Sequence, residues 1–237
     1  MATDTFFNGR LLIHQHPTGY RYSIDAVLLA AQVFPRLDDT ILDLGTGCGI
    51  IALILAYRFP GVLIYGVEIQ KKLADFAIHN VIANKMSDQI RIVHQDMKTL
   101  DMGNFPDKID MVITNPPYYK VKTGRTNPDR QRAIAKHEIC ITLQDIVLTA
   151  RRLLSIKGKF VIIYPAERIT ALLIEMHNAD IEPKKLRMVH SGWHTPAQLV
   201  IATGVKGGRP GLKVETPLVL YDQSNEYTEE VRKIFEP

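Results

Sequence analysis

Cysteine and long apolar runs are both scarce in this chain. Its 237 residues include two cysteines, Cys48 and Cys140, which lie far apart in the sequence. They provide neither a disulfide framework nor a ligand cluster, which fits a reducing compartment. The longest apolar run, Ile50 to Tyr57, is far shorter than the roughly 20 residues that span a bilayer. The N-terminal residues also lack the pattern of a signal peptide, so we expect a soluble, cytoplasmic protein.

Metal-ligand spacing is missing as well. His14 and His16 are one residue apart, and His190 and His194 flank an expected turn. Neither pair has carboxylate or cysteine partners at the spacing that metal sites use. We therefore expect no metal.

The apolar content is sufficient for one substantial core. Hydrophobic residues make up 46% of the chain, and its length falls within the range of one large α/β domain. We expect a single domain over residues 1–237. It would comprise an N-terminal hairpin and helix at 1–35, a core at 40–205 and a C-terminal extension at 206–237.

Positive charge is concentrated in one segment. The formal net charge is +4 and the pI is near 9.0, which mildly favours an anionic partner. Residues 120–137 carry six cations and one anion, Asp129, so this segment alone has a net charge of +5 with His137 neutral. It is either a solvated loop or a set of contacts to a nucleic-acid backbone. The six cations are Lys120, Lys122, Arg125, Arg130, Arg132 and Lys136.

A glycine-rich loop follows the first buried strand that we expect, Thr40 to Leu44. Glycines let the backbone turn tightly and let a ligand approach it, and the apolar helix from Ile50 would point its N-terminus at that ligand. Ile50 stands where a dinucleotide fingerprint has its last glycine, so the pattern departs from that of NAD-binding proteins. Asp43 could hold a ligand's ammonium group or brace the loop. The loop consists of Gly45, Thr46, Gly47, Cys48 and Gly49.

Acidic residues follow the next two expected strands. Glu68 comes nineteen residues after Gly49, at the tip of a buried strand over 62–67. A carboxylate there can accept both hydroxyls of a ribose, although a solvated side chain at a strand end would look the same. Asp96 follows a strand over 90–94 and could bind the amine of an adenine ring, a weaker assignment because acidic residues are common in such loops.

The segment Asn115-Pro116-Pro117-Tyr118 ends a further buried strand over 109–114. Two prolines cannot continue a strand, so the chain must leave the sheet as a rigid extended loop. The Asn115 side-chain oxygen and the Pro116 carbonyl can each accept one hydrogen of a flat primary amine, and Tyr118 can stack on the group that carries it. A simple strand-ending turn is the alternative.

The remaining pattern predicts alternating strands and helices. Asn8-Gly9 between apolar runs indicates a hairpin, a small lid before the sheet, and Ser23 could cap the helix that follows it. Thr142 and Asp145 resemble a capping box for a helix that we expect to end near Ser155, closed by Gly158. Further segments are a strand over 159–164, a helix from Pro165 to about Asn178, an antiparallel pair over 186–190 and 199–205, and an edge strand within 214–221.

Together these features resemble the class I, Rossmann-fold methyltransferases that use S-adenosylmethionine, in the branch that methylates amino groups with an Asn-Pro-Pro-Tyr loop. The resemblance implies a seven-stranded, mostly parallel α/β sheet with helices on both faces and an antiparallel last strand. It implies that 43–49 bind the methionine part of the cofactor, Glu68 the ribose and Asp96 the adenine. Residues 115–118 would form the catalytic loop, with Asn115 also beside the cofactor.

Over nearly its whole length the chain is similar to the bacterial tRNA adenine-N6 methyltransferases that modify adenosine 37 of a valine tRNA. The similarity includes the segment 19–29, the doubled tyrosine Tyr118-Tyr119 and the run Lys136-His137-Glu138. It implies N6-methylation of adenine in a tRNA, with the basic segment 120–137 contacting RNA phosphates.

Rival functions share parts of this pattern. Protein-glutamine methyltransferases use the same loop but carry an added N-terminal helical domain, and only about forty residues precede the first strand here. Guanine-N2 ribosomal RNA enzymes more often have phenylalanine at the position of Tyr118. A nicotinamide-dependent oxidoreductase would share the strand order, but Ile50 and the Pro-Pro loop argue against it. A catalytically silent RNA-binding relative would have lost site residues, all of which are present here.

Overall fold

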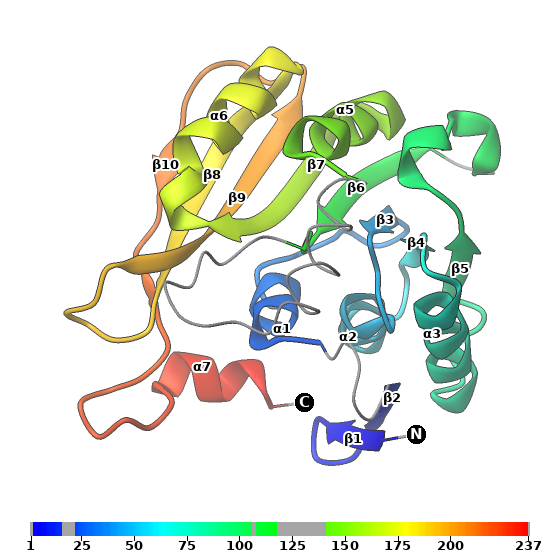
Figure 1. Cartoon of the computed structure of the whole chain (residues 1–237), viewed down its shortest axis with the longest axis horizontal. Coiled ribbons are helices and arrows are strands. Elements are labelled where there is room, and N and C mark those ends of the chain that lie inside the picture. Colours follow the sequence, from blue (N-terminus) through cyan, green and yellow to red (C-terminus); the bar gives the residue numbers. More distant parts are fainter. Residues whose placement is uncertain (1, 16–21, 106–107, 118–140, 237) are drawn as a thin grey trace, which may run out of the picture.

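A mostly parallel sheet forms the centre of the computed structural model (Figure 1). The structure describes residues 2–15, 22–105, 108–117 and 141–236. In this part of the chain, two-residue strands β10 (Lys213–Val214) and β11 (Leu218–Val219) pair with the edge of the main sheet. The longer strands are β3 (Thr40–Leu44), β4 (Leu63–Glu68), β5 (Ile90–His94), β6 (Ile109–Thr114), β7 (Leu154–Pro165), β8 (Ile181–His190) and β9 (Ala197–Lys206).

The strand order is β10-β8-β9-β7-β6-β3-β4-β5, with β11 also beside β8. Within the described main sheet only β9 is antiparallel to both of its neighbours, so the expected mostly parallel sheet with an antiparallel last long strand is confirmed. The short strands β10 and β11 bring this sheet to nine strands, where seven were expected. Successive strands run outward from β3 to β5, and the chain then returns to place β6 on the other side of β3. Ligands of α/β sheets bind beside the carboxyl ends of the strands at such a reversal.

Helices cover both faces of the sheet (Figure 1), and two apolar clusters lie beneath them. No helix in the described ranges is long and apolar enough to cross a membrane. The described residues also form the short 3-10 turns η1 (Met97–Thr99), η2 (Met102–Asn104) and η3 (Ala166–Arg168). One face carries α1 (Ile24–Ala30), α2 (Ile50–Arg58), α3 (Lys71–Ala83) and α7 (Glu229–Ile234), and the other carries α5 (Leu143–Leu153) and α6 (Ile169–Asn178).

The expected N-terminal hairpin is confirmed as β1 (Ala2–Phe6) and β2 (Leu11–Gln15). Its turn places Asn8 and Gly9 at φ values of 54° and 84°, which Asn and Gly tolerate better than other residues. Leu11 and Ile13 are fully buried in the same apolar cluster as α1 and α2. The hairpin that we expected to be a small lid before the sheet is therefore part of the core.

Two expected helix ends differ in detail from the structure. Ser23 occupies the N-cap position of α1, but its side chain makes no capping hydrogen bond. The capping box of Thr142 and Asp145 is confirmed, yet α5 ends at Leu153, and β7 begins at once because Leu154 pairs with Ile109 of β6. Gly158 therefore lies inside a strand instead of closing a helix.

The glycine at position 158 has a steric cause. A Cβ there would lie 2.8 Å from the Ser155 carbonyl oxygen, so a side chain would collide with the backbone of its own strand. The apolar patterns also underestimated the lengths of β8 and β9, which begin at Ile181 and Ala197 instead of at 186 and 199.

Candidate cofactor and catalytic site

Strand register brings the sequence-predicted site residues to one edge of the sheet. Leu44, the last residue of β3, pairs with Thr114 of β6 on one side and with Val67 of β4 on the other. Glu68 in turn pairs with His94, the last residue of β5. Glu68 is the last residue of β4, and the glycine loop, Asp96 and Asn115 follow the ends of β3, β5 and β6. Because the strands are parallel, their carboxyl ends meet at this edge.

The glycine loop is fixed by hydrogen bonds from its backbone. The amides of Gly45 and Thr46 donate to the Val67 carbonyl at 2.9 and 3.0 Å, so the loop folds over the end of β4. Gly45, Gly47 and Gly49 have φ values of 74°, 61° and 86°, which explains the glycine at each position. A Cβ on Gly45 would meet no described atom within 4 Å, so open space lies beside the loop there.

Asp43 is fully buried beneath this loop. Its Oδ2 accepts a hydrogen bond from the Thr46 hydroxyl at 2.6 Å, whereas Oδ1 has no hydrogen-bond partner among the described residues. Burial raises the pKa of this carboxyl to about 7, against the Thr46 hydrogen bond, which lowers it, and with the charge of Glu68, which raises it further. A buried carboxylate with one unpaired oxygen destabilises the fold unless a ligand donates a hydrogen bond or a positive charge to that oxygen.

Glu68 is also buried, but its oxygens are bonded. Oε2 accepts from the Gly47 amide at 3.0 Å and Oε1 from the Gln70 amide at 2.8 Å. The side chain therefore braces the glycine loop from β4. Each carboxylate oxygen has a further lone pair, so bracing the loop and accepting ribose hydroxyls are compatible roles.

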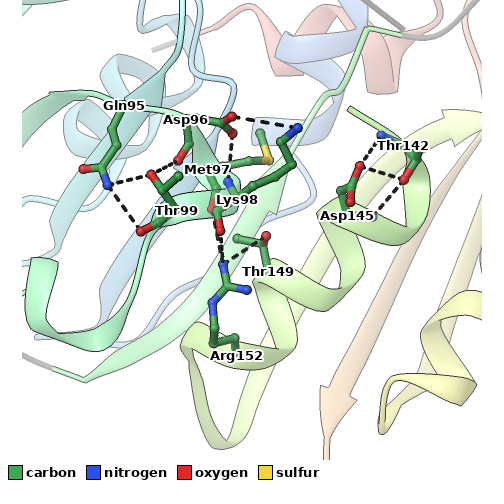
Figure 2. A network of polar contacts seen from close by, with 9 residues as sticks. All are labelled: Gln95, Asp96, Met97, Lys98, Thr99, Thr142, Asp145, Thr149 and Arg152. Atoms are coloured by element: carbon green, nitrogen blue, oxygen red, sulfur yellow. Dashed lines mark hydrogen bonds and ion pairs between the residues drawn. The ribbon is translucent and has the colours of Figure 1, made fainter. Parts of the chain in front are cut away.

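Asp96 is the N-cap residue of η1, and its Oδ1 accepts a hydrogen bond from the Lys98 amide at 2.9 Å (Figure 2). Its side chain keeps 31% of its surface exposed. Arg152 of α5 holds the far end of the same turn, because its guanidinium donates to the carbonyls of Leu100 and Lys98 at 3.0 and 3.2 Å. No local sequence pattern predicts that a residue so distant contacts the Asp96 turn.

Asn115 leaves the sheet directly beside the glycine loop. The buried Thr114 hydroxyl donates to the Leu44 carbonyl at 2.8 Å, which ties the end of β6 to the residue before Gly45. Asn115 is half-buried, Pro116 is buried and Pro117 is exposed. Tyr118 and the six basic residues of 120–137 lie outside the described residues, so their expected roles remain predictions.

Cys48 is buried in the glycine loop. Burial raises the pKa of its thiol to about 11, so the sulfur stays protonated at neutral pH and is not a nucleophile. Its contribution to the loop is the backbone carbonyl, which accepts a hydrogen bond from Asn80 of α3 at 2.9 Å. Within the described ranges, no group of three or more His, Cys, Asp or Glu side chains is arranged to hold a metal.

Asn80 is a residue that the sequence analysis missed. It lies on the buried face of α3, beside the apolar residues Leu73, Ala77 and Val81. A polar residue on the buried face of an amphipathic helix is the signal that could have identified it.

Comparison with known proteins agrees with this arrangement. Residues 23–177 match the family model described as "Methyltransferase small domain". The chain belongs to this family. As a member it is an S-adenosylmethionine-dependent methyltransferase, and the matched range contains the glycine loop, Glu68, Asp96 and Asn115.

Curated relatives of this methyltransferase share one printed name. A tRNA1(Val) (adenine(37)-N6)-methyltransferase of Porphyromonas gingivalis is 36% identical over 210 residues, covering 85% of this chain and 81% of the relative. A protein of the same name from Bacteroides thetaiotaomicron is 30% identical and covers 99% of this chain and 98% of the relative.

Solved structures show the same fold. A predicted O-methyltransferase of Agrobacterium tumefaciens aligns with a TM-score of 0.70 at 21% identity, over 89% of this chain and 94% of that one. A geranyl diphosphate C-methyltransferase of Streptomyces coelicolor aligns with a TM-score of 0.54 at 17% identity, over 77% of each chain. Their different reactions fit a common scaffold whose substrate is set by local residues.

Proposed function

We propose that this methyltransferase transfers a methyl group from S-adenosylmethionine to the N6 amine of adenine in RNA, at adenosine 37 of a tRNA. The observation that carries the proposal is the position of Asn115-Pro116, joined through Thr114 to the start of the glycine loop. The two proposed hydrogen-bond acceptors for the substrate amine thus lie beside the start of the glycine loop. The printed names of the curated relatives support the same substrate. An enzyme that acts on tRNA would work in the cytoplasm, which is the localisation we propose.

The residues of the sheet edge suit S-adenosylmethionine chemically. Asp43 offers a buried, unpaired carboxylate oxygen to the ammonium group of the cofactor, and the glycine loop offers space beside Gly45. Glu68 would accept hydrogen bonds from the ribose hydroxyls, and Asp96 would accept one from the adenine amine. When bound, the cofactor supplies an electrophilic methyl group, so the protein has to align the two reactants and needs no covalent intermediate of its own.

Asn115 and Pro116 would hold the substrate amine. The exocyclic nitrogen of adenine is a weak nucleophile because its lone pair is conjugated with the ring. Two acceptors, the Asn115 side-chain oxygen and the Pro116 carbonyl, draw its two hydrogens out of the ring plane and free the lone pair. Pro117 restricts the backbone of Pro116 to an extended conformation, which keeps the carbonyl available.

Adenine must leave the anticodon-loop stack to reach these acceptors. Tyr118 would replace the lost stacking with its ring, as aromatic side chains do for single-stranded bases. The six basic residues of 120–137 would contact phosphates of the same RNA. Both assignments come from the sequence.

The decisive test is methylation of unmodified total tRNA with labelled S-adenosylmethionine, followed by nucleoside digestion and mass analysis. We expect N6-methyladenosine, and a transcript of the valine tRNA with adenosine 37 changed to guanosine should lose it. N2-methylguanosine from ribosomal RNA, or N5-methylglutamine from a protein, would contradict the proposal. Separate titration with S-adenosylhomocysteine shows whether a silent protein still binds its cofactor product.

A further inference from the structure

An amide side chain of α3 binds both the N-terminal hairpin and the glycine loop. Asn80 is fully buried. Its Oδ1 accepts from the His14 amide at 2.7 Å, and its Nδ2 donates to the His14 carbonyl at 2.9 Å. The second hydrogen of Nδ2 goes to the Cys48 carbonyl, also at 2.9 Å. Every strong hydrogen-bonding group of this side chain is therefore used, and these partners fix which atom is oxygen and which nitrogen.

One helical turn later, Asn84 repeats half of this pattern. Its Oδ1 accepts from the Leu12 amide at 2.9 Å, and its Nδ2 donates to the Leu12 carbonyl at 2.7 Å. The two asparagines thus act toward alternate residues of β2 as a neighbouring strand would, satisfying the backbone of an edge strand. The difference between them is that only Asn80 also reaches the glycine loop among the contacts described.

The Cys48 carbonyl is a distinct attachment of that loop. Strand β4 holds the loop through two residues. Its Val67 carbonyl accepts from the amides of Gly45 and Thr46, and its Glu68 carboxylate accepts from the amide of Gly47. The bond from Asn80 instead fastens the loop from α3, on the side of the hairpin. Its removal would leave a buried carbonyl unpaired between two glycines with positive φ, where the backbone resists displacement least.

We propose that Asn80 is a positioning residue that couples attachment of the N-terminal hairpin to the conformation of the cofactor-binding glycine loop. The inference rests on the proposed function in one respect, that this loop binds S-adenosylmethionine. Asn80 does not touch reacting atoms in this account. It lowers the freedom of the loop before the cofactor arrives, and preorganisation of this kind increases affinity without a new contact to the ligand.

The test compares two asparagines that hold the same strand. Binding of S-adenosylhomocysteine is measured by calorimetry for the wild type, Asn80→Ala, Asn80→Asp and Asn84→Ala, with thermal melts of each. Asn80→Asp keeps the acceptor for the His14 amide but turns a carboxylate toward two carbonyls. Asn84→Ala releases Leu12 and removes the hydrogen bond from Asn84 Nδ2 to the Asn80 backbone carbonyl, but leaves the Asn80 side chain and its bond to Cys48 intact.

We expect Kd to rise roughly five- to tenfold for both Asn80 variants, the effect of about one hydrogen bond, and less than about twofold for Asn84→Ala. An equal rise in all variants would overturn the proposal, because general loosening of the hairpin would then explain it. An unchanged Kd in folded Asn80 variants would overturn it as well. Failure of the wild type itself to bind would instead refute the cofactor assignment.

A second measurement needs no variant and so survives if the Asn80 substitutions fail to fold. Coupling between two sites is reciprocal, so a ligand on the glycine loop must strengthen the hairpin attachment that favours it. We expect S-adenosylhomocysteine to slow hydrogen exchange of the His14 amide severalfold, and that of Leu12 less. Slower exchange of glycine-loop amides with no change at His14 would show that the coupling is absent.

Discussion

At the scale of single residues, the site is built from buried groups that the sheet edge leaves incompletely satisfied. Asp43 is the clearest case, since one oxygen is bonded to Thr46 and the other has no partner among the described residues. Glu68 carries the same charge nearby but is held by two backbone amides. Two neighbouring acids therefore differ in environment, and of the two only Asp43 has an oxygen without a hydrogen-bond partner among the described residues.

Asp43 makes the stability of the ligand-free protein depend on pH. Its pKa is about 7 in the fold and 3.8 ordinarily, so the folded state retains a proton that the unfolded chain releases. This contribution to the unfolding free energy is fully present below about pH 4 and is lost as pH rises to about 7. We expect Asp43→Asn to be more stable than the wild type at pH 8, by about 1 to 3 kcal/mol.

Denaturant unfolding of both proteins at pH 5 and pH 8 measures this effect, and the advantage of the variant should shrink at the lower pH. Asp43→Asn should also bind S-adenosylhomocysteine more weakly at pH 7.5, because the ammonium group of this ligand loses its anionic partner, the Asp43 carboxylate. A stability difference independent of pH would show that Asp43 is ionised throughout.

Asn115 is expected to act on the reaction rather than on the cofactor. Asn115→Ala removes one of two acceptors for the substrate amine, and a lost acceptor in a preorganised site costs about a hundredfold in kcat. Asn115→Asp keeps a side-chain oxygen in place and should retain more activity. Single-turnover methylation measures the rate, and titration with S-adenosylhomocysteine should give the same Kd within about twofold. Parallel loss of both quantities would indicate a structural role.

At the scale of helices and strands, packing against the glycine loop constrains residues outside the motif. Gly66 lies in β4, where a Cβ would come within 3.0 Å of the Thr46 side chain and 2.9 Å of Ile92. Gly45 has a positive φ of 74° but open space around it. The two glycines are thus required for different reasons, close approach in one case and backbone conformation in the other.

This difference yields a paired experiment. Gly66→Ala should push Thr46 away from Asp43, lowering stability by about 1 to 3 kcal/mol and weakening cofactor binding. Gly45→Ala should cost about 1 kcal/mol through strain alone. Thermal melts and titrations with S-adenosylhomocysteine separate the two effects. An unperturbed affinity in Gly66→Ala would mean that the loop adapts to the added methyl group.

The sequence predicted elements whose signals are local and missed those set by distant contacts. The apolar runs before Gly45 and Asn115 identify buried strands, and the Thr142 capping box marks a helix start, because neighbouring residues determine each of them. The end of α5 was misjudged because pairing of Leu154 with β6 decides it. Asn80 escaped notice because its partners, His14 and Cys48, are remote in sequence.

At the scale of the whole molecule, the strand order converts motifs spread over about seventy residues into one edge. Because the strand order reverses at β3, strands β4 and β6 lie on either side of β3 and of the glycine loop that follows it. Glu68 and Asp96 therefore approach the loop from one side, and the Asn-Pro-Pro loop approaches it from the other. The stretch 118–140 starts after Pro117 at this edge and precedes α5. The positive charge of the basic segment 120–137 therefore follows the proposed amine site, Asn115-Pro116, closely in the sequence.

If the basic segment contacts RNA phosphates, its charge should set the salt dependence of tRNA binding. Each phosphate contact contributes about 0.7 to 0.9 to the slope of log K against log salt. Replacing Arg130 and Arg132 by glutamine should weaken tRNA binding at low salt and reduce that slope by about 1 to 2. Lys85→Gln with Lys157→Gln is the matched control, since both lysines are exposed, one after α3 and the other near the start of β7. Filter binding over a range of salt concentrations measures both. Equal slopes for the two double variants would mean that Arg130 and Arg132 make no phosphate contact, whatever happens to overall affinity.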